Sequence, residues 1–219
     1  MAETSTRWRE ALADNNHPLY KAAWLVFTDR ISTEMAFEHL KDAQETVVPF
    51  LNEILADDSL FDNDSPGKGI APANAVRLLG EYQAREAFPK ILELYADSTS
   101  PAMRSASVYA VNKFGPEVLD QIIEWAGEDG TRRPKAAALI VEIGVGNEKA
   151  FETLLGWIDP EVSGLEYYAR YLTKINPEAA ITALEKLSKD TRFHGDVRRR
   201  FKDRIKEAQQ ALRAAQPTS

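Results

Sequence analysis

The 219-residue chain has no cysteine, and this absence excludes several kinds of chemistry. Without thiols it has no disulfide, no thiolate nucleophile and no cysteine-based zinc or iron–sulfur site. Histidine is almost as scarce, since only His17, His39 and His194 offer an imidazole, and none stands in a recognisable catalytic triad. We therefore expect no catalytic residue, no metal site and no cofactor.

Long apolar runs are also missing. No stretch approaches the roughly 20 residues that cross a bilayer, and the first 20 residues lack the apolar core of a signal peptide. With 44% hydrophobic and 28% charged residues, the composition is typical of a folded globular chain. The sequence predicts a cytoplasmic protein without a membrane partner.

Charge is spread unevenly over the chain, which has 34 acids, 27 bases and a net charge of −7. The segment from Thr191 to Arg213 holds eight bases and three acids, or +5, which leaves −12 for the rest. Such an acidic body repels a phosphate backbone and attracts a basic partner. We expect a protein partner rather than nucleic acid; acidity that serves only solubility is the alternative.

Two internal repeats indicate the fold. Residues 49–57 (PFLNEILAD) resemble residues 89–97 (PKILELYAD) at an offset of 40. An apolar residue followed by Gly or Asn also recurs at intervals of about 30 to 35 residues, at Leu79-Gly80, Phe114-Gly115, Ile143-Gly144 and Ile175-Asn176. Because Gly and Asn accept the left-handed conformation that closes many helices, we expect a helix to end at each of these points.

The residues around these stops predict pairs of helices. Apolar residues lie four positions before each terminator, at Val76, Val111, Ile140 and Leu172, and others lie five and seven before it. These offsets share one helical face, and a second apolar helix follows each stop. Paired helices at a period of about 30 to 40 residues are typical of an all-α solenoid.

Two segments carry a resemblance to a known family. Residues 74–80 (NAVRLLG) and 135–144 (KAAALIVEIG) are similar to HEAT-like repeats of the phycobilisome-lyase type, and the similarity extends over about Ser32 to Lys189. The predicted organisation is an N-terminal helical cap (1–31), HEAT-like repeats (32–189) and a basic C-terminal capping helix and tail (190–219). The resemblance implies that the second helices line a concave binding surface.

An insertion at residues 57–70 interrupts the repeats. It contains four aspartates and the sequence Ser65-Pro66-Gly67-Lys68-Gly69. The spacing matches neither a calcium loop nor a phosphate-binding loop. We expect a solvated loop, with a secondary partner contact as the alternative.

The predicted second helices supply the candidate partner-binding residues. Glutamates recur at similar positions and would form an acidic ladder if the repeats stack, although a solvated helix face fits as well. Two tryptophans at equivalent positions serve either as partner anchors or as core between repeats. The candidates are Glu53, Glu93, Tyr95, Glu124, Trp125, Trp157 and Glu185.

Three consecutive arginines, Arg198, Arg199 and Arg200, open the predicted last helix. Cations in a first turn oppose the helix dipole, so a compensating contact is expected. That contact is an anion or phosphate, an acidic partner, or local pairing with Asp190 and Asp196.

We conclude from the sequence that the chain is a non-catalytic HEAT-like module. It would bind a basic protein or peptide on a concave acidic face, as an adaptor, assembly factor or inhibitor. The alternative is an enzyme or enzyme subunit that resembles a bilin lyase or an alkyl-base DNA glycosylase. The acidic body argues against the glycosylase, which needs a cationic groove.

Overall fold

The computed structural model describes residues 7–127 and 130–215, and every regular element within these ranges is helical. The all-α class is therefore confirmed. The first six residues of the predicted N-terminal cap and the last four of the predicted tail lie outside the described residues. The chain divides into two compact units, Met1–Gly115 and Pro116–Ser219, which we describe one at a time.

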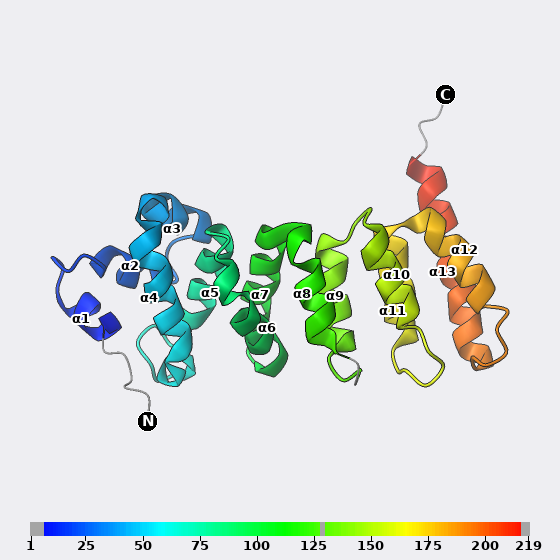
Figure 1. The fold of residues 1–219 in the computed structure, drawn as a ribbon, viewed down its shortest axis with the longest axis horizontal. Helices are drawn as coiled ribbons and strands as arrows, with labels where there is room; N and C mark the ends of the chain where they lie inside the picture. Colours follow the sequence, from blue (N-terminus) through cyan, green and yellow to red (C-terminus); the bar gives the residue numbers. More distant parts are fainter. Residues whose placement is uncertain (1–6, 128–129, 216–219) are drawn as a thin grey trace. The chain divides into compact units, whose positions relative to one another are not determined.

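The N-terminal unit is built around α5. Helices α2, α3, α4 and α7 all pack on α5, and α6 packs on α7 (Figure 1). Its helices are α1 (Arg7–Ala13), α2 (Tyr20–Val26), α3 (Thr33–Leu40), α4 (Gln44–Ala56), α5 (Ala71–Glu81), α6 (Phe88–Asp97) and α7 (Pro101–Phe114), with the short 3-10 helices η1 (Lys41–Ala43), η2 (Asp58–Phe61) and η3 (Arg85–Ala87).

The C-terminal unit is built around α11, which contacts α9, α10, α12 and α13 (Figure 1). Helix α8 packs on α9, and α13 also packs along α12. Its helices are α8 (Leu119–Ala126), α9 (Arg133–Ile143), α10 (Glu148–Gly156), α11 (Leu165–Ile175), α12 (Pro177–Leu187) and α13 (Gly195–Ala215).

The predicted helices are present in both units, and in the C-terminal unit α9 packs on α10 and α11 on α12 as pairs. The first helices of the pairs are α5, α7, α9 and α11, and the second helices are α6, α8, α10 and α12, with α4 as the second helix of an earlier pair. The predicted inner face is confirmed, because Val76, Val111, Ile140 and Leu172 are all 0% exposed. Within each unit the first helices pack on one another, α5 on α7 and α9 on α11. A continuous HEAT-like solenoid stays a prediction.

The reason given for three of the four helix stops is wrong. Asn176 follows α11 with an extended backbone, at a φ of −150°, and its side chain caps α12. Gly80 lies inside α5, and a Cβ there would sit 2.7 Å from the Cα of Ala110. Gly144 follows α9 with a φ of −97°, and a Cβ there would sit 2.7 Å from the Cβ of Ala150. Both glycines are thus required by close packing, and not by a left-handed turn. Gly115, with a φ of 69°, is the stop that needs positive φ.

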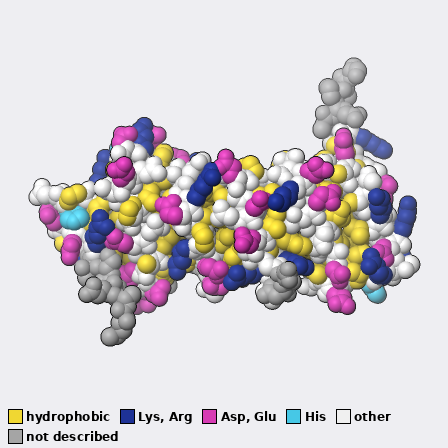
Figure 2. All heavy atoms as spheres, viewed as in Figure 1, with side chains coloured by type: hydrophobic (Ala, Val, Ile, Leu, Met, Phe, Trp, Pro, Cys, Tyr) yellow, Lys and Arg dark blue, Asp and Glu magenta, His cyan; other side chains and the backbone are white. Residues whose placement is uncertain are grey.

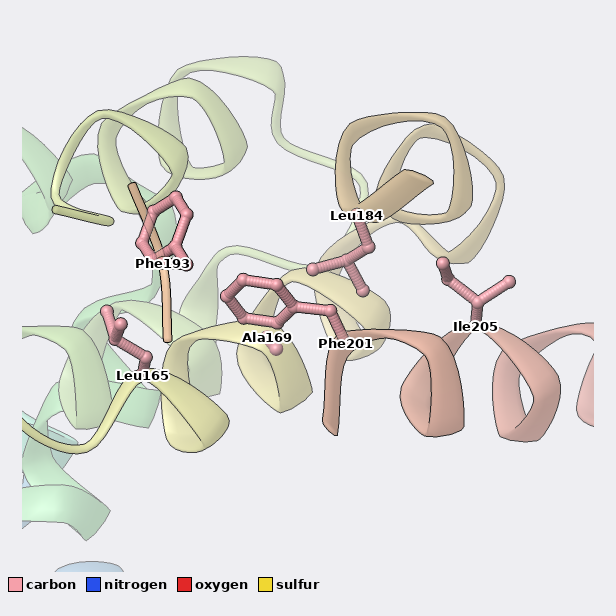
Figure 3. Close-up of a cluster of buried hydrophobic side chains, with 6 residues drawn as sticks. All are labelled: Leu165, Ala169, Leu184, Phe193, Phe201 and Ile205. Carbon is pink, nitrogen blue, oxygen red and sulfur yellow. The ribbon is translucent and has the colours of Figure 1, made fainter. Parts of the chain in front are cut away.

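The C-terminal end is closed by an apolar cluster (Figure 3). One face of α13 is apolar and turned to the protein, since Phe201, Ile205 and Ala208 are buried and Val197 and Leu212 are half-buried. The rings of Phe193 and Phe201 meet edge to face, with centroids 5.5 Å apart. The cluster joins α11, α12 and α13 through Leu165, Ala169, Leu184, Phe193, Phe201 and Ile205.

The N-terminal end is closed by a polar contact. The indole N–H of Trp8 donates a hydrogen bond to Asp57 over 2.8 Å, and its ring stacks on Phe27 at 5.3 Å. Asp57 is only 4% exposed and also accepts from the hydroxyl of Ser59 at 2.6 Å. The first residue of the predicted 57–70 loop is therefore a buried anchor, and η2 follows it directly.

None of the helices in the described ranges has the length and apolar character needed to cross a bilayer.

Candidate functional site

The helices of the pairs differ systematically in charge. Each second helix (α4, α6, α8, α10 and α12) carries two acids and at most one base. No first helix (α5, α7, α9 or α11) has more acids than bases, and α7 has two bases and no acid. Acidic charge is thus concentrated on the second helices, although hydrophobic and basic side chains are interspersed with acids on the face in Figure 2.

In the N-terminal unit the predicted residues lie on α4 and α6. Glu53 on α4 pairs with Arg7 of α1 at 2.5 Å, so part of its charge is used within the protein. Glu93 and Tyr95 on α6 are both half-buried. Glu53 therefore serves at least partly to hold helix α1 against α4.

A polar hollow of about 850 Å³ lies beside these helices in the same unit. It is formed by η1, the first half of α4 and Glu86 of η3, and it contains the acids Asp42, Glu45 and Glu86. Its single base, Lys41, forms an ion pair with Glu38 at 2.8 Å. The hollow therefore presents an excess of negative charge.

In the C-terminal unit, Glu124 on α8 and Glu185 on α12 are exposed, as the acidic-ladder prediction requires. Glu53 and Glu93 belong to the other unit, so a ladder across all four stays a prediction. The structure brings each acid to a second helix and leaves the two exposed ones open to a partner.

The two predicted tryptophans are neither fully buried core nor fully exposed. Trp125 on α8 is half-buried, with the guanidinium of Arg132 over its ring at 5.2 Å. Trp157 directly follows α10 and is half-buried, with Arg133 over its ring at 5.8 Å. Each ring is therefore partly accessible and has an arginine as neighbour, a combination common in interface anchors.

An apolar groove of about 550 Å³ separates the second helices α10 and α12. Its floor and walls come from Phe151 and Leu155 of α10 and from Ala179, Ala183 and Leu187 of α12. The exposed Glu152 and Lys186 also line it, so charged groups of both signs border apolar surface. This groove was not predicted from the sequence, because it is formed by two helices that are separated along the chain by α11.

Comparison with known proteins does not assign the chain to a family. No protein-family model matches the chain, and no curated protein matches its sequence significantly. The side chains of the two units are thus the only basis for a functional proposal.

The three arginines at the start of α13 have different surroundings. Arg199 pairs with Asp196 at 3.1 Å, and Arg200 pairs with Glu166 of α11 at 3.1 Å. Arg198 is half-buried, and its Nε is buried without a hydrogen-bond partner among the described residues. Two of the three predicted anion contacts thus already have a carboxylate partner.

A titratable cluster in the N-terminal unit was also missed. The hydroxyl of Tyr109 donates to Glu81, which pairs with Lys113 at 2.9 Å. Burial raises the pKa of Tyr109, and the carboxylates of Glu81 and Glu34 raise it further. The tyrosine is therefore neutral and ties α7 to α5. Within the described part of the chain, no three acids or histidines are grouped to hold a metal ion.

A tyrosine-lined pocket in the C-terminal unit is the third feature that the sequence did not reveal. It has a volume of about 310 Å³ and lies between the starts of α9 and α11. Its lining residues are Pro134, Ser163, Gly164, Tyr167, Tyr168 and Tyr171. The feature visible in the sequence was three tyrosines, Tyr167, Tyr168 and Tyr171, within the seven residues after Gly164.

Proposed function

We propose that the chain is a non-catalytic HEAT-like repeat module that binds a basic protein or peptide along its second helices. It would act as an adaptor, assembly factor or inhibitor, with the second-helix face as its concave side. The partner is a protein because the acidic face repels phosphate and offers apolar surface.

The observation that carries this proposal is the charge difference between the two kinds of helix. All five second helices have an excess of acids, and none of the first helices does. General solubility would be served equally well by acids on either kind of helix. A face of one sign attracts a partner of the other sign and speeds their encounter.

Two features of the C-terminal unit support a partner that makes apolar contacts as well as ionic ones. The groove between α10 and α12 supplies apolar contact next to exposed acids. Trp125 on α8 offers a half-buried aromatic ring beside Glu124. Apolar and aromatic contacts give an interface most of its affinity, while the surrounding charges select the partner.

The test is a double charge reversal on the proposed face, Glu124→Lys with Glu185→Lys. The matched control is Asp203→Lys with Glu207→Lys, which changes the net charge equally but on α13. Immobilised wild-type and variant proteins are incubated with an extract of the source organism, and retained proteins are quantified by mass spectrometry.

We expect a basic protein to be retained by the wild type and the control, and at least about tenfold less by the face variant, which corresponds to about 1.4 kcal/mol. Retention that increases as the salt concentration is lowered would support an electrostatic contribution to partner binding. Equal losses in both variants would assign the effect to net charge, and unchanged retention by the face variant would refute the proposed face.

A further inference from the structure

The groove between α10 and α12 has large residues on one wall and small residues on the other. Phe151 and Leu155 stand one turn apart on α10, and Ala179 and Ala183 stand one turn apart on α12. The lining residues of α12 run from Ala179 to Leu187, which is roughly 12 Å along the helix. Most of these side chains are half-buried, so apolar surface remains accessible over about two helical turns.

Four glutamates border this groove. Glu152 lines it, and Glu148 lies one turn earlier on the same side of α10. Glu178 and Glu185 each directly precede a lining residue of α12. All four are exposed, and none of them forms an ion pair with another part of the chain that the structure describes. Their charge is therefore available to a partner.

The acids of the neighbouring first helices are used differently. Helices α9 and α11 have one acid each, Glu142 and Glu166. Glu142 pairs with Lys174 at 3.1 Å, and Glu166 pairs with Arg200 at 3.1 Å. The first helices of this unit thus spend their acids on ion pairs within the protein, whereas the acids beside the groove are left for a cationic partner.

The groove has little positive charge of its own. Helices α10 and α12 carry one lysine each. Lys149 of α10 pairs with Asp120 of α8 at 2.8 Å, so its charge is already compensated. Lys186 of α12 lines the groove and is exposed. The balance beside the groove is therefore four acids against one uncompensated base.

The walls of the groove favour a helical segment over an extended one. Both walls are α-helices, whose main-chain groups are bonded within each helix, so they offer no strand edge to an extended chain. An extended segment would place its own N–H and C=O groups against Phe151, Leu155 and Leu187, where they would lose their hydrogen bonds to water. A helix pairs these groups internally and presents its apolar side chains on one face.

We propose that the groove between α10 and α12 binds a basic amphipathic α-helix of the partner. This inference rests on the proposed function and names the segment that the second-helix face recognises. Apolar side chains one turn apart on the partner helix enter the groove beside Ala179 and Ala183. Lysines or arginines that flank this apolar face lie against the four glutamates.

The probe is a phage-displayed library of random peptides of about 16 residues, selected on the immobilised full chain. The enriched peptides are synthesised and titrated into the protein by isothermal titration calorimetry, and their helicity is followed by circular dichroism. We expect the enriched sequences to share apolar residues at i, i+3 or i+4 and i+7, with lysine or arginine between them, and to gain helical signal on binding.

The decisive variant is Ala183→Leu, which fills the groove without changing any charge. We expect it to weaken binding of the selected peptides at least tenfold. The matched control is Ala138→Leu, the same change at a half-buried alanine of α9 that does not line the groove, and it should bind as the wild type does. Circular dichroism of the free proteins verifies that both variants are folded.

Two further variants test the charges with opposite signs. Glu152→Gln removes an acid of the groove, and Lys186→Gln removes its base, both at exposed positions. We expect the first to weaken peptide binding about threefold at low salt and the second to strengthen it by a similar factor. A purely structural role of these side chains would not change affinity in opposite directions.

Four results would overturn the proposal: no enriched sequence, enrichment of proline-rich or alternating sequences that bind in an extended form, enrichment of helices without an excess of bases, and equal peptide binding by Ala183→Leu. Sedimentation that shows a dimer of the wild type, lost in Ala183→Leu, would assign the groove to a second copy and also overturn it. None of these results depends on the double charge reversal at Glu124 and Glu185, so the groove can fail while the proposed function stands.

Discussion

The two units of the molecule differ in how they satisfy the hydroxyl of a buried tyrosine. In the N-terminal unit, Tyr82 is 7% exposed and donates to the carbonyl of Leu40 at 2.5 Å. The half-buried Asn74 donates to the carbonyl of Val26 at 2.9 Å. In the C-terminal unit, the even more deeply buried Tyr168 has no such acceptor among the described residues.

The two ends of the molecule also differ in the kind of contact that closes them. The N-terminal end is fixed by the hydrogen bond between Trp8 and Asp57, and the C-terminal end by the apolar cluster around Phe201. The N-terminal unit thus closes its end with polar contacts, whereas the C-terminal unit closes its end with apolar packing and has a buried tyrosine hydroxyl without a partner in the described part of the chain.

The largest expected effect on stability comes from the apolar cluster at the C-terminal end. Phe201 is fully buried, so Phe201→Ala removes a ring from the cluster and leaves a cavity. We expect it to lower the free energy of unfolding by about 3 to 5 kcal/mol, measured by urea denaturation. Leu212→Ala, at a half-buried position of the same helix, is the control and should cost much less. A loss below about 1 kcal/mol for Phe201→Ala would contradict the apolar account of this end.

Mutation at the polar N-terminal end should lower the free energy of unfolding by a smaller amount, and this loss should depend on pH. Burial raises the pKa of Asp57, but hydrogen bonds from Ser59 and Trp8 outweigh it, so the net pKa is lowered. Asp57→Asn should then cost about 1.5 to 3 kcal/mol near pH 7. Because the pKa is lower in the folded state, this stabilisation is present above the usual carboxyl pKa and is lost as the pH falls through the folded value.

The measurement is urea denaturation at several pH values between 7 and 3, on the wild type and Asp57→Asn. We expect the gap in stability between the two proteins to close toward pH 3. The control is Asp97→Asn, at the equivalent position of the second segment of the 40-residue offset, where the side chain is exposed. If the Asp57 gap does not change with pH, the charged hydrogen bond is not what holds this end.

The local pattern of the sequence predicted much of the fold. Apolar residues at helical spacing, such as Val76 and Val111, had to be buried on one face, and they are. The role of Gly80 was not predictable in this way, because its partner Ala110 is 30 positions away and belongs to another helix. A glycine needed for helix contact and a glycine needed for a turn look alike in a sequence.

The candidate site was predictable in part. Charge on the second helices could be counted, and the exposure of Glu124 and Glu185 agrees with that count. The pairing of Glu53 with Arg7 depends on how α1 folds back on α4, which no local pattern encodes. The tyrosine pocket depends on the contact between α9 and α11, and its orphan hydroxyl is visible only when the surroundings of Tyr168 are known.

The smallest effect gives the sharpest comparison of the two units, since the same change is made in each. Tyr82→Phe removes a hydroxyl that donates to Leu40, so we expect a loss of about 0.5 to 1.5 kcal/mol in the free energy of unfolding. Tyr168→Phe removes a hydroxyl with no partner in the described part of the chain, so stability should stay the same or rise slightly. Thermal and urea denaturation without ligand measure both. Equal losses would mean that Tyr168 is satisfied in solution, and the contrast between the units would disappear.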